Sequence, residues 1–295
     1  MSQRAYLLPA AAALAGVACL SLMDAFMKGA ALAIGAFSAA WLRSVLGTAM
    51  AAPLWLLRGG IWPRRDVLRL HLLRGVVSAF MALSFFYALT KLPIAEAIAI
   101  SFIAPLIALY LAKLWLGEVI RPAAVFASVL GFAGTLVIVG GRIEQGSFSQ
   151  DAALGLAAIL FSALLYAVNF IIIRKQSQMA GPAEIATFHS GVAAAILGLA
   201  VPFLFVAPVM GIMIEIALAS ALTVAGAMAI AWAYARAETQ ALVPLEYSGF
   251  LWAALFGWLF FDEQVTASTL LGTAIIVIAC LIASRRPSRP TQSAL

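Results

Sequence analysis

The sequence has 295 residues, of which 65% are hydrophobic and 10% are charged, and its formal net charge is +6. Soluble domains have about 25% charged residues, so this composition excludes a soluble globular protein and predicts an all-α polytopic membrane protein. The two cysteines, Cys19 and Cys280, lie inside apolar runs, which argues against a disulfide framework or a metal site.

Ten apolar segments follow one another along the chain, each near the roughly 20 residues that a helix needs to cross a bilayer. Charge clusters, glycines and prolines bound the predicted transmembrane helices, which cover residues 7–28, 36–57, 69–90, 94–115, 122–140, 152–173, 182–206, 211–235, 240–261 and 267–284. The first segment has features of a signal peptide, but its apolar run continues past Ala18, so we expect a retained helix. The polar, basic residues 285–295 predict a disordered tail.

The basic residues predict how the chain is oriented in the membrane. Thirteen lysines and arginines lie at one set of segment ends, namely Arg4, Arg58, Arg64, Arg65, Arg69, Lys113, Arg121, Arg174, Lys175, Arg236, Arg285, Arg286 and Arg289. Only three, Lys28, Lys91 and Arg142, lie at the opposite ends. Because cytoplasmic ends are enriched in Lys and Arg, both termini are expected in the cytoplasm, with the chain in the inner (plasma) membrane.

The chain also contains an internal repeat. At an offset of 145 residues, three pairs of residues align: Asp24 with Asn169, Tyr87 with Trp232, and Glu118 with Glu263. Residues 1–145 are therefore predicted to form a first five-helix repeat and residues 146–284 a second, followed by a basic cytoplasmic tail at 285–295. Because five is an odd number, the second repeat enters the membrane from the opposite side. Inverted repeats are typical of secondary transporters, whose substrate sites lie near the midplane between the halves.

Two carboxylates occupy matching places in these repeats. Glu118 precedes the segment 122–140, and Glu263 precedes the segment 267–284. A carboxylate just before a helix accepts hydrogen bonds from free backbone N–H groups and faces the positive end of the helix dipole. We therefore expect a helix-capping or gating role for both residues, one on each side of the membrane.

Charged side chains within the apolar segments are costly at the bilayer centre, so they usually face the protein interior or a water-filled cavity. Asp24 and Glu96 are candidates for a coupling or polar relay. Arg43 and His189 are expected to cap or bond neighbouring helices. Arg74 is expected near the membrane interface, in a structural role.

The helix ends LGE at 116–118 and FDE at 261–263, Pro105 thirteen residues before the first acid, and the two five-helix halves resemble the drug/metabolite transporter superfamily, EamA type. Within that superfamily the chain looks most like bacterial YddG-type exporters of amino acids, including aromatic ones. The resemblance covers nearly the whole chain. It implies ten helices around a central cavity, alternating access and a small-molecule substrate. Phe250 stands where the family often has proline, with Pro244 six residues earlier, so the halves are expected to bend differently.

The expected substrate site lies between the halves and includes Tyr87, Ser101, Phe102, Tyr166, Asn169, Trp232, Glu246 and Tyr247. These are polar or aromatic positions on proline-kinked or repeat-matched segments, and irregular backbone at membrane depth is tolerated where it lines a cavity. For an amino-acid cargo, Asn169 offers a donor and an acceptor, and Glu246 offers a partner for the ammonium group. Simpler interpretations are an interhelical hydrogen bond for Asn169, a kink without a ligand, and packing for the aromatic rings.

Export of small metabolites is the leading functional prediction, and the resemblance favours amino acids as the cargo. Import or export of another metabolite or a drug, such as a nucleobase or vitamin, is the alternative. A membrane-embedded transferase is disfavoured because the sequence has neither an Asp-rich metal motif nor a nucleophile with a neighbouring base. The sequence also lacks an ATPase motif. We expect no cofactor and no nucleic-acid partner, since the basic residues lie between apolar runs; the partners are a small-molecule substrate and membrane lipid.

Overall fold

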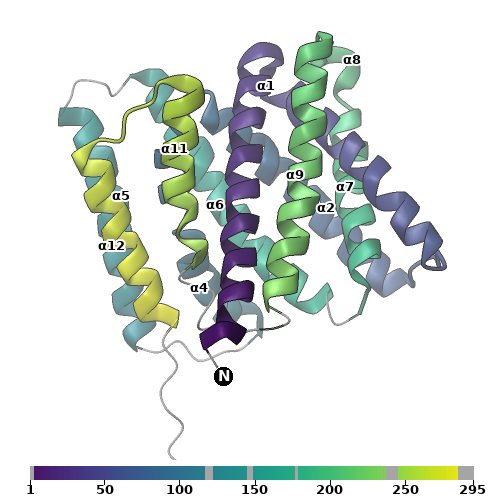
Figure 1. Cartoon of the computed structure of the whole chain (residues 1–295), viewed down its shortest axis with the longest axis horizontal. Helices are drawn as coiled ribbons and strands as arrows, with labels where there is room; N and C mark the ends of the chain where they lie inside the picture. The colour runs from purple at the N-terminus through teal and green to yellow at the C-terminus, as the bar shows by residue number, and fades with distance from the viewer. Residues whose placement is uncertain are drawn as a thin grey trace, which may run out of the picture.

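The computed structural model describes residues 3–116, 122–144, 149–176, 179–234, 236 and 245–284. Within these residues the chain forms helices and no strands, and Figure 1 shows most of the helices side by side in one bundle. In chain order they are α1 (Gln3–Leu57), α2 (Arg65–Leu89), α3 (Ile94–Ser101), α4 (Ala104–Leu116), α5 (Pro122–Glu144), α6 (Gln150–Gln176), α7 (Pro182–Gly198), α8 (Val201–Leu204), α9 (Met210–Tyr234), α11 (Gly249–Phe261) and α12 (Ala267–Ser284). The N-terminus and the end of α12 lie at the same end of the bundle (Figure 1).

The longest helix, α1, contains two of the predicted segments, 7–28 and 36–57. Gly35, which lies between them, has φ 82° and ψ 149°, a backbone conformation that glycine adopts without strain and other residues do not. Figure 1 shows α1 reversing its direction at the end of the bundle opposite the N-terminus. Gly35 therefore lets one apolar stretch run along the bundle twice, as two limbs.

Two further segments are interrupted within their length. The predicted helix 94–115 is divided into α3 and α4 beside Phe102. Pro105 has no amide hydrogen, and its ring crowds the carbonyl group one turn earlier, so a continuous helix is disfavoured there. In the second half Pro244 lies outside the described part of the chain, and α11 begins at Gly249 after a short turn.

Several helices have the length and apolar character of membrane spans. In the described part of the chain, five are long and apolar enough to cross a membrane: Leu7–Leu57, Arg65–Leu89, Ile94–Trp115, Gln150–Ile173 and Met210–Ile230. Three shorter apolar helices cover Ser128–Gly141, Gly249–Phe261 and Ala267–Ile282. Large apolar side chains also point outward, among them Leu57 and Phe203, each 85% exposed. The count of ten crossings and the inversion of the halves stay predictions.

The two predicted halves pack against each other through glycines. Gly134 in α5 faces Gly272 in α12, and a Cβ atom added to Gly134 would lie 2.7 Å from the carbonyl oxygen of Gly272. Gly16 in α1 faces Gly226 in α9, where the corresponding distance to the Gly226 carbonyl oxygen is 2.9 Å. Since no side chain separates these backbones, the helices approach closely, which is a common means of helix association in membranes.

Candidate functional site

A buried polar centre lies between α1, α2, α6 and α7. In it Arg74 donates from Nε to Asn169 Oδ1 and from Nη1 to Gln176 Oε1, each at 3.0 Å. Arg74 is 7% exposed and Asn169 is 6% exposed, so the Arg74 side chain is buried and hydrogen-bonded within the protein rather than hydrated at the membrane interface. Because α2 belongs to the first predicted half and α6 to the second, these hydrogen bonds join the halves.

Arg43 enters the same centre from the second limb of α1. Its Nη2 donates to Thr223 Oγ1 at 3.4 Å, and its guanidinium carbon lies 5.6 Å from the ring centre of Phe86. Asp24, on the first limb of α1, is buried and interacts electrostatically with Arg43. Within the described residues, however, no carboxylate oxygen lies within 4.0 Å of a nitrogen of Arg43 or Arg74.

Tyr166 adds an aromatic ring and a phenol to the centre. Its ring centre lies 4.6 Å from that of Phe170, and its phenol interacts electrostatically with Glu246 and Asp24. Tyr166 is 40% exposed. Asn169 follows it by three residues on the same face of α6. The structure thus brings together Asp24, Tyr166, Asn169 and Glu246 from three separate predicted segments of the chain.

A chain of polar contacts continues from this centre, from α6 through α2 to α7. Gln176 contacts Nδ1 of His71, and Nε2 of His71 lies 2.8 Å from Glu184 Oε1. His71 is fully buried, and its ring stacks on Phe188 with ring centres 4.7 Å apart. Helix α2 is therefore tied to α6 and α7, which belong to the other predicted half.

Two aromatic rings meet where the helices are interrupted. Phe102, between α3 and α4, and Tyr247, just before α11, have ring centres 5.2 Å apart with planes at 89°. The thiol of Cys280 donates to the carbonyl oxygen of Phe102 at 3.2 Å. Positions 102 and 247 differ by 145 residues (247 − 102), the offset of the internal repeat. In the predicted repeat, such equivalent positions would meet near the axis between the two halves.

The repeat-matched pair Tyr87 and Trp232 lies away from this centre. Tyr87 lines a cavity of about 510 Å³ at the bend of α1, together with Gly35 and Phe37. Trp232, near the end of α9, is 40% exposed, and the guanidinium carbon of Arg236 lies 4.2 Å from its ring centre. The structure does not bring these two aromatic residues together.

Ser101 and Glu96 make local or peripheral contacts. Ser101 Oγ donates to the carbonyl oxygen of Ala97 in its own helix at 2.8 Å. Glu96 is 5% exposed, and its Oε1 accepts a hydrogen bond from Thr269 Oγ1 at 3.4 Å. The contact of Glu96 links α3 to α12. Both contacts are separate from those of Arg74 and Asn169.

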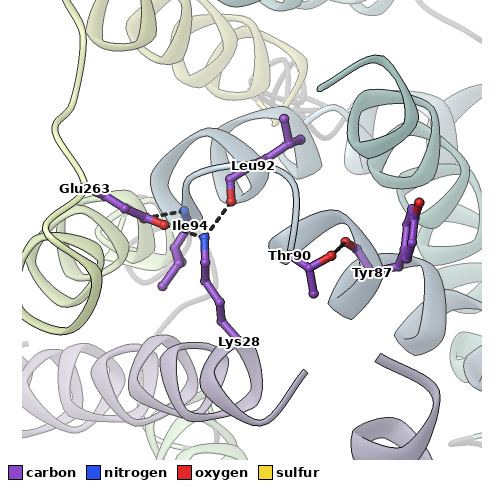
Figure 2. A network of polar contacts seen from close by, with 6 residues as sticks. All are labelled: Lys28, Tyr87, Thr90, Leu92, Ile94 and Glu263. Carbon is purple, nitrogen blue, oxygen red and sulfur yellow. Dashed lines mark hydrogen bonds and ion pairs between the residues drawn. The ribbon is translucent and has the colours of Figure 1, made fainter. Parts of the chain in front are cut away.

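A buried ion pair that the sequence reasoning missed joins the predicted halves at the end of the bundle opposite the termini. Figure 2 shows Lys28 Nζ against Glu263 Oε1 and the carbonyl oxygen of Leu92, the latter at 2.7 Å. The second oxygen of Glu263 accepts from the backbone N–H of Ile94 at 2.8 Å. The side chains of Lys28 and Glu263 are 7% and 14% exposed. The available signal was Lys28 itself, one helical turn after Asp24 in an apolar segment.

Glu263 caps a helix, but a different one from the helix that follows it. It accepts from Ile94, the first residue of α3, whose N–H has no acceptor within its own helix. The start of α12 is instead capped by Thr266, whose Oγ1 accepts from the N–H of Thr269 at 3.1 Å. Glu118, the repeat mate of Glu263, lies outside the described residues.

Comparison with known proteins decides the family. Two stretches of the chain, residues 7–140 and 153–285, match the model of the EamA-like transporter family. The chain belongs to this family. A solved crystal structure matches it with a TM-score of 0.63 at 21% identity, over 93% of this chain and 96% of that chain, a likeness that shows the fold alone.

Three curated relatives are transporters with different cargoes. The chain is 28% identical to the pseudopaline exporter CntI of Pseudomonas aeruginosa, over 90% of this chain and 92% of the relative. It is 29% identical to a riboflavin transporter of Rhizobium johnstonii, over 74% and 71% of the two chains. It is 28% identical to an S-adenosylmethionine uptake transporter of Rickettsia felis, over 72% and 70%.

This EamA-like protein is therefore a multi-pass membrane transporter of small molecules and not an enzyme. The names of the three relatives include both export and uptake, and none of the three is named as an amino-acid exporter. The drug/metabolite resemblance is thus confirmed at the level of the family, whereas the likeness to YddG-type exporters is not.

Proposed function

We propose that this transporter exports small metabolites, in particular amino acids including aromatic ones, across the inner membrane. The polar centre carries the proposal, because it places acidic groups beside aromatic rings at the same point. Asp24 and Glu246 interact with the phenol of Tyr166 and offer negative charge to an ammonium group. The rings of Tyr166 and Phe170 offer apolar contact to a side chain, which discriminates weakly between similar groups.

The mechanism we assign is alternating access between two inverted five-helix repeats, residues 1–145 and 146–284, with both termini in the cytoplasm. Two separate family matches, at 7–140 and 153–285, support two related halves. The contact between Phe102 and Tyr247 supports an axis between them. In this arrangement the Lys28–Glu263 ion pair is the gate at the external end, because it bonds one half to the other.

Another cargo is the second candidate. The relatives named for riboflavin and S-adenosylmethionine favour it, and a vitamin, nucleobase or drug with a planar ring would also stack on the aromatic residues. Transport by facilitation or exchange fits the lack of an ATPase motif in the sequence. Asp24 and Glu96 are the candidates for a coupling relay, since both are buried acids.

Counterflow in proteoliposomes tests the proposal. Vesicles that contain the purified protein and unlabelled L-phenylalanine should accumulate external labelled L-phenylalanine, and empty vesicles should not. Asp24→Asn should slow this accumulation strongly, whereas Asp151→Asn, which changes an exposed acid on α6, should not. Counterflow of riboflavin or S-adenosylmethionine without counterflow of L-phenylalanine would replace the proposed cargo with the alternative.

A further inference from the structure

Two arginines in the polar centre have no acidic partner in contact. Within the described residues, Arg74 bonds to the amide oxygens of Asn169 and Gln176, and Arg43 bonds to the hydroxyl of Thr223. No carboxylate oxygen lies within 4.0 Å of either guanidinium in that part of the chain. A charged group buried at membrane depth is costly unless an opposite charge matches it. Asp24 offsets part of the charge of Arg43 without touching it, so the two guanidinium groups together keep the capacity to bind an anion.

Some buried polar atoms of Arg43 and of residues on neighbouring helices have no hydrogen-bond partner in the described structure. Arg43 Nε, His189 Nδ1 and Ser78 Oγ are buried and lack a hydrogen-bond partner in the described structure. His189 interacts electrostatically with both Arg43 and Arg74, and Ser78 lies one turn after Arg74 on α2. The two hydrogen bonds of Arg74 use Nε and Nη1, which leaves Nη2 for another acceptor. Because buried polar groups are nearly always hydrogen-bonded, these unused atoms are available to a bound ligand.

The acids and the arginines of the polar centre also share neighbours. Asp24 and Glu246 both interact with Tyr166, and Arg43 and Arg74 both interact with His189. Asp24 and Arg43 interact with each other, so the two groups of charges adjoin. A substrate with an ammonium group and a carboxylate can place its carboxylate beside the arginines.

We propose that Arg43 and Arg74 form the subsite that binds the carboxylate of the transported metabolite, with His189 and Ser78 completing its hydrogen bonds. The planar guanidinium group matches the two oxygens of a carboxylate and forms paired, charge-assisted hydrogen bonds with them. Asn169 then acts on Arg74 rather than on the substrate, since its Oδ1 accepts from Arg74 Nε and holds the guanidinium in place. The inference rests on the proposed transport through the polar centre, but any carboxylate of suitable size satisfies it.

Matched probes test the subsite on the unaltered protein. The first pair is 3-phenylpropionate and 3-phenylpropionamide, and the second is L-phenylalanine and L-phenylalaninamide; the members of each pair differ only in the carboxylate. Binding is measured by titration of the purified transporter in detergent. Since hydrogen bonds to charged groups are the stronger class, the acid should bind about tenfold or more tightly than its amide in at least one pair. The absence of an acid preference in both pairs overturns the proposal.

Variants test which residues produce the preference for the acid over its amide. Arg74→Gln and Arg43→Gln should each reduce the ratio of amide to acid dissociation constants toward one, and Arg74→Lys should retain part of the ratio because it keeps the charge without the planar fork. Arg69→Gln, an exposed change on the same helix as Arg74, should leave the ratio unchanged. If Arg74→Gln and Arg43→Gln lower the melting temperature but keep the wild-type ratio, the arginines are structural and the proposal fails.

The test is separate from that of the cargo. If L-phenylalanine shows no counterflow but 3-phenylpropionate still binds more tightly than its amide, the cargo is wrong and the carboxylate subsite stands. If L-phenylalanine shows counterflow but neither acid binds more tightly than its amide, the cargo is right and the subsite is overturned. Where a variant fails to fold, the ratio measured on the wild-type protein decides.

Discussion

Two lysines at the same end of the bundle form ion pairs in different surroundings. The side chains of Lys28 and Glu263 are 7% and 14% exposed, whereas those of Lys91 and Asp151 are 26% and 66% exposed. The hydrogen bond to Asp151 raises the pKa of Lys91 above its ordinary value, so Lys91 stays charged at neutral pH. Water screens the exposed pair but hardly reaches the buried one, so the two pairs should differ in their importance for stability.

Removal of Lys28 is the sharper of the two changes. Lys28→Gln leaves Glu263 buried without its cation, and breaking a buried ion pair in this way costs about 3–5 kcal/mol. The melting temperature of the purified protein in detergent should therefore fall clearly. Lys91→Gln should change it little, because its pair is exposed. Equal effects of the two variants on the melting temperature would contradict the description of Lys28–Glu263 as a buried ion pair between the predicted halves.

Asn169 provides a second prediction for a single residue. Asn169→Ala removes the acceptor that holds Arg74 Nε, so transport should fall strongly, on the order of tenfold from the loss of one hydrogen bond to a charged group. The matched control is Leu164→Ala on the same helix, where the side chain is 43% exposed. Initial rates of counterflow, corrected for the amount of protein in the membrane, provide the measurement. A normal rate in Asn169→Ala would mean that Arg74 needs no support from Asn169.

At the scale of helices, the bend of α1 depends on one residue. Gly35→Ala adds a side chain where φ is 82°, and nothing else lies within 4 Å of the added Cβ, so its cost comes from backbone strain, about 1–3 kcal/mol. Gly140→Ala is the matched control, because its Cβ also meets nothing within 4 Å and its backbone is helical; alanine there should stabilise the helix by up to about 1 kcal/mol. Thermal unfolding in detergent compares the two variants, which should shift in opposite directions.

The helices were easier to predict from the sequence than their contacts. Length and apolarity are local properties, so the segments 94–115 and 267–284 coincide closely with α3–α4 and α12. The interruption beside Phe102 was also foreseeable, because Pro105 is a local cause. The hydrogen-bond partner of Glu263 could not be foreseen. Glu263 accepts from the backbone N–H of Ile94, which lies 169 residues earlier in the chain (263 − 94 = 169).

In the candidate site, too, some residues could be predicted from the sequence, whereas their contacts could not. Tyr166, Asn169 and Glu246 were found because polar residues in apolar segments are conspicuous, and the structure gathers them. Arg74 was expected near the membrane interface, in a structural role. Its burial comes from amide acceptors on another helix, Asn169 and Gln176. No local pattern in the sequence reports such a contact.

At the scale of the whole molecule, the orientation in the membrane is open to a direct test. In a background without native cysteines, Ile61→Cys should be shielded from impermeant thiol reagents in intact cells, and Gln150→Cys should react. Both positions are exposed in the structure, so differences in labelling report the side of the membrane and not burial. Lysed cells provide the control, in which both cysteines should react. The reverse pattern in intact cells would place the Lys28–Glu263 gate on the cytoplasmic side.

The contact between Phe102 and Tyr247 has a consequence for protein engineering. These two positions are equivalent in the proposed repeats and their rings touch, so a change at one position alters the surroundings of the other. A larger ring at one position must be accommodated by the other. The exchange Phe102→Tyr with Tyr247→Phe keeps the amino-acid composition and moves a single hydroxyl group from one half to the other. It is thus the smallest change that reverses the asymmetry of the two halves at their junction.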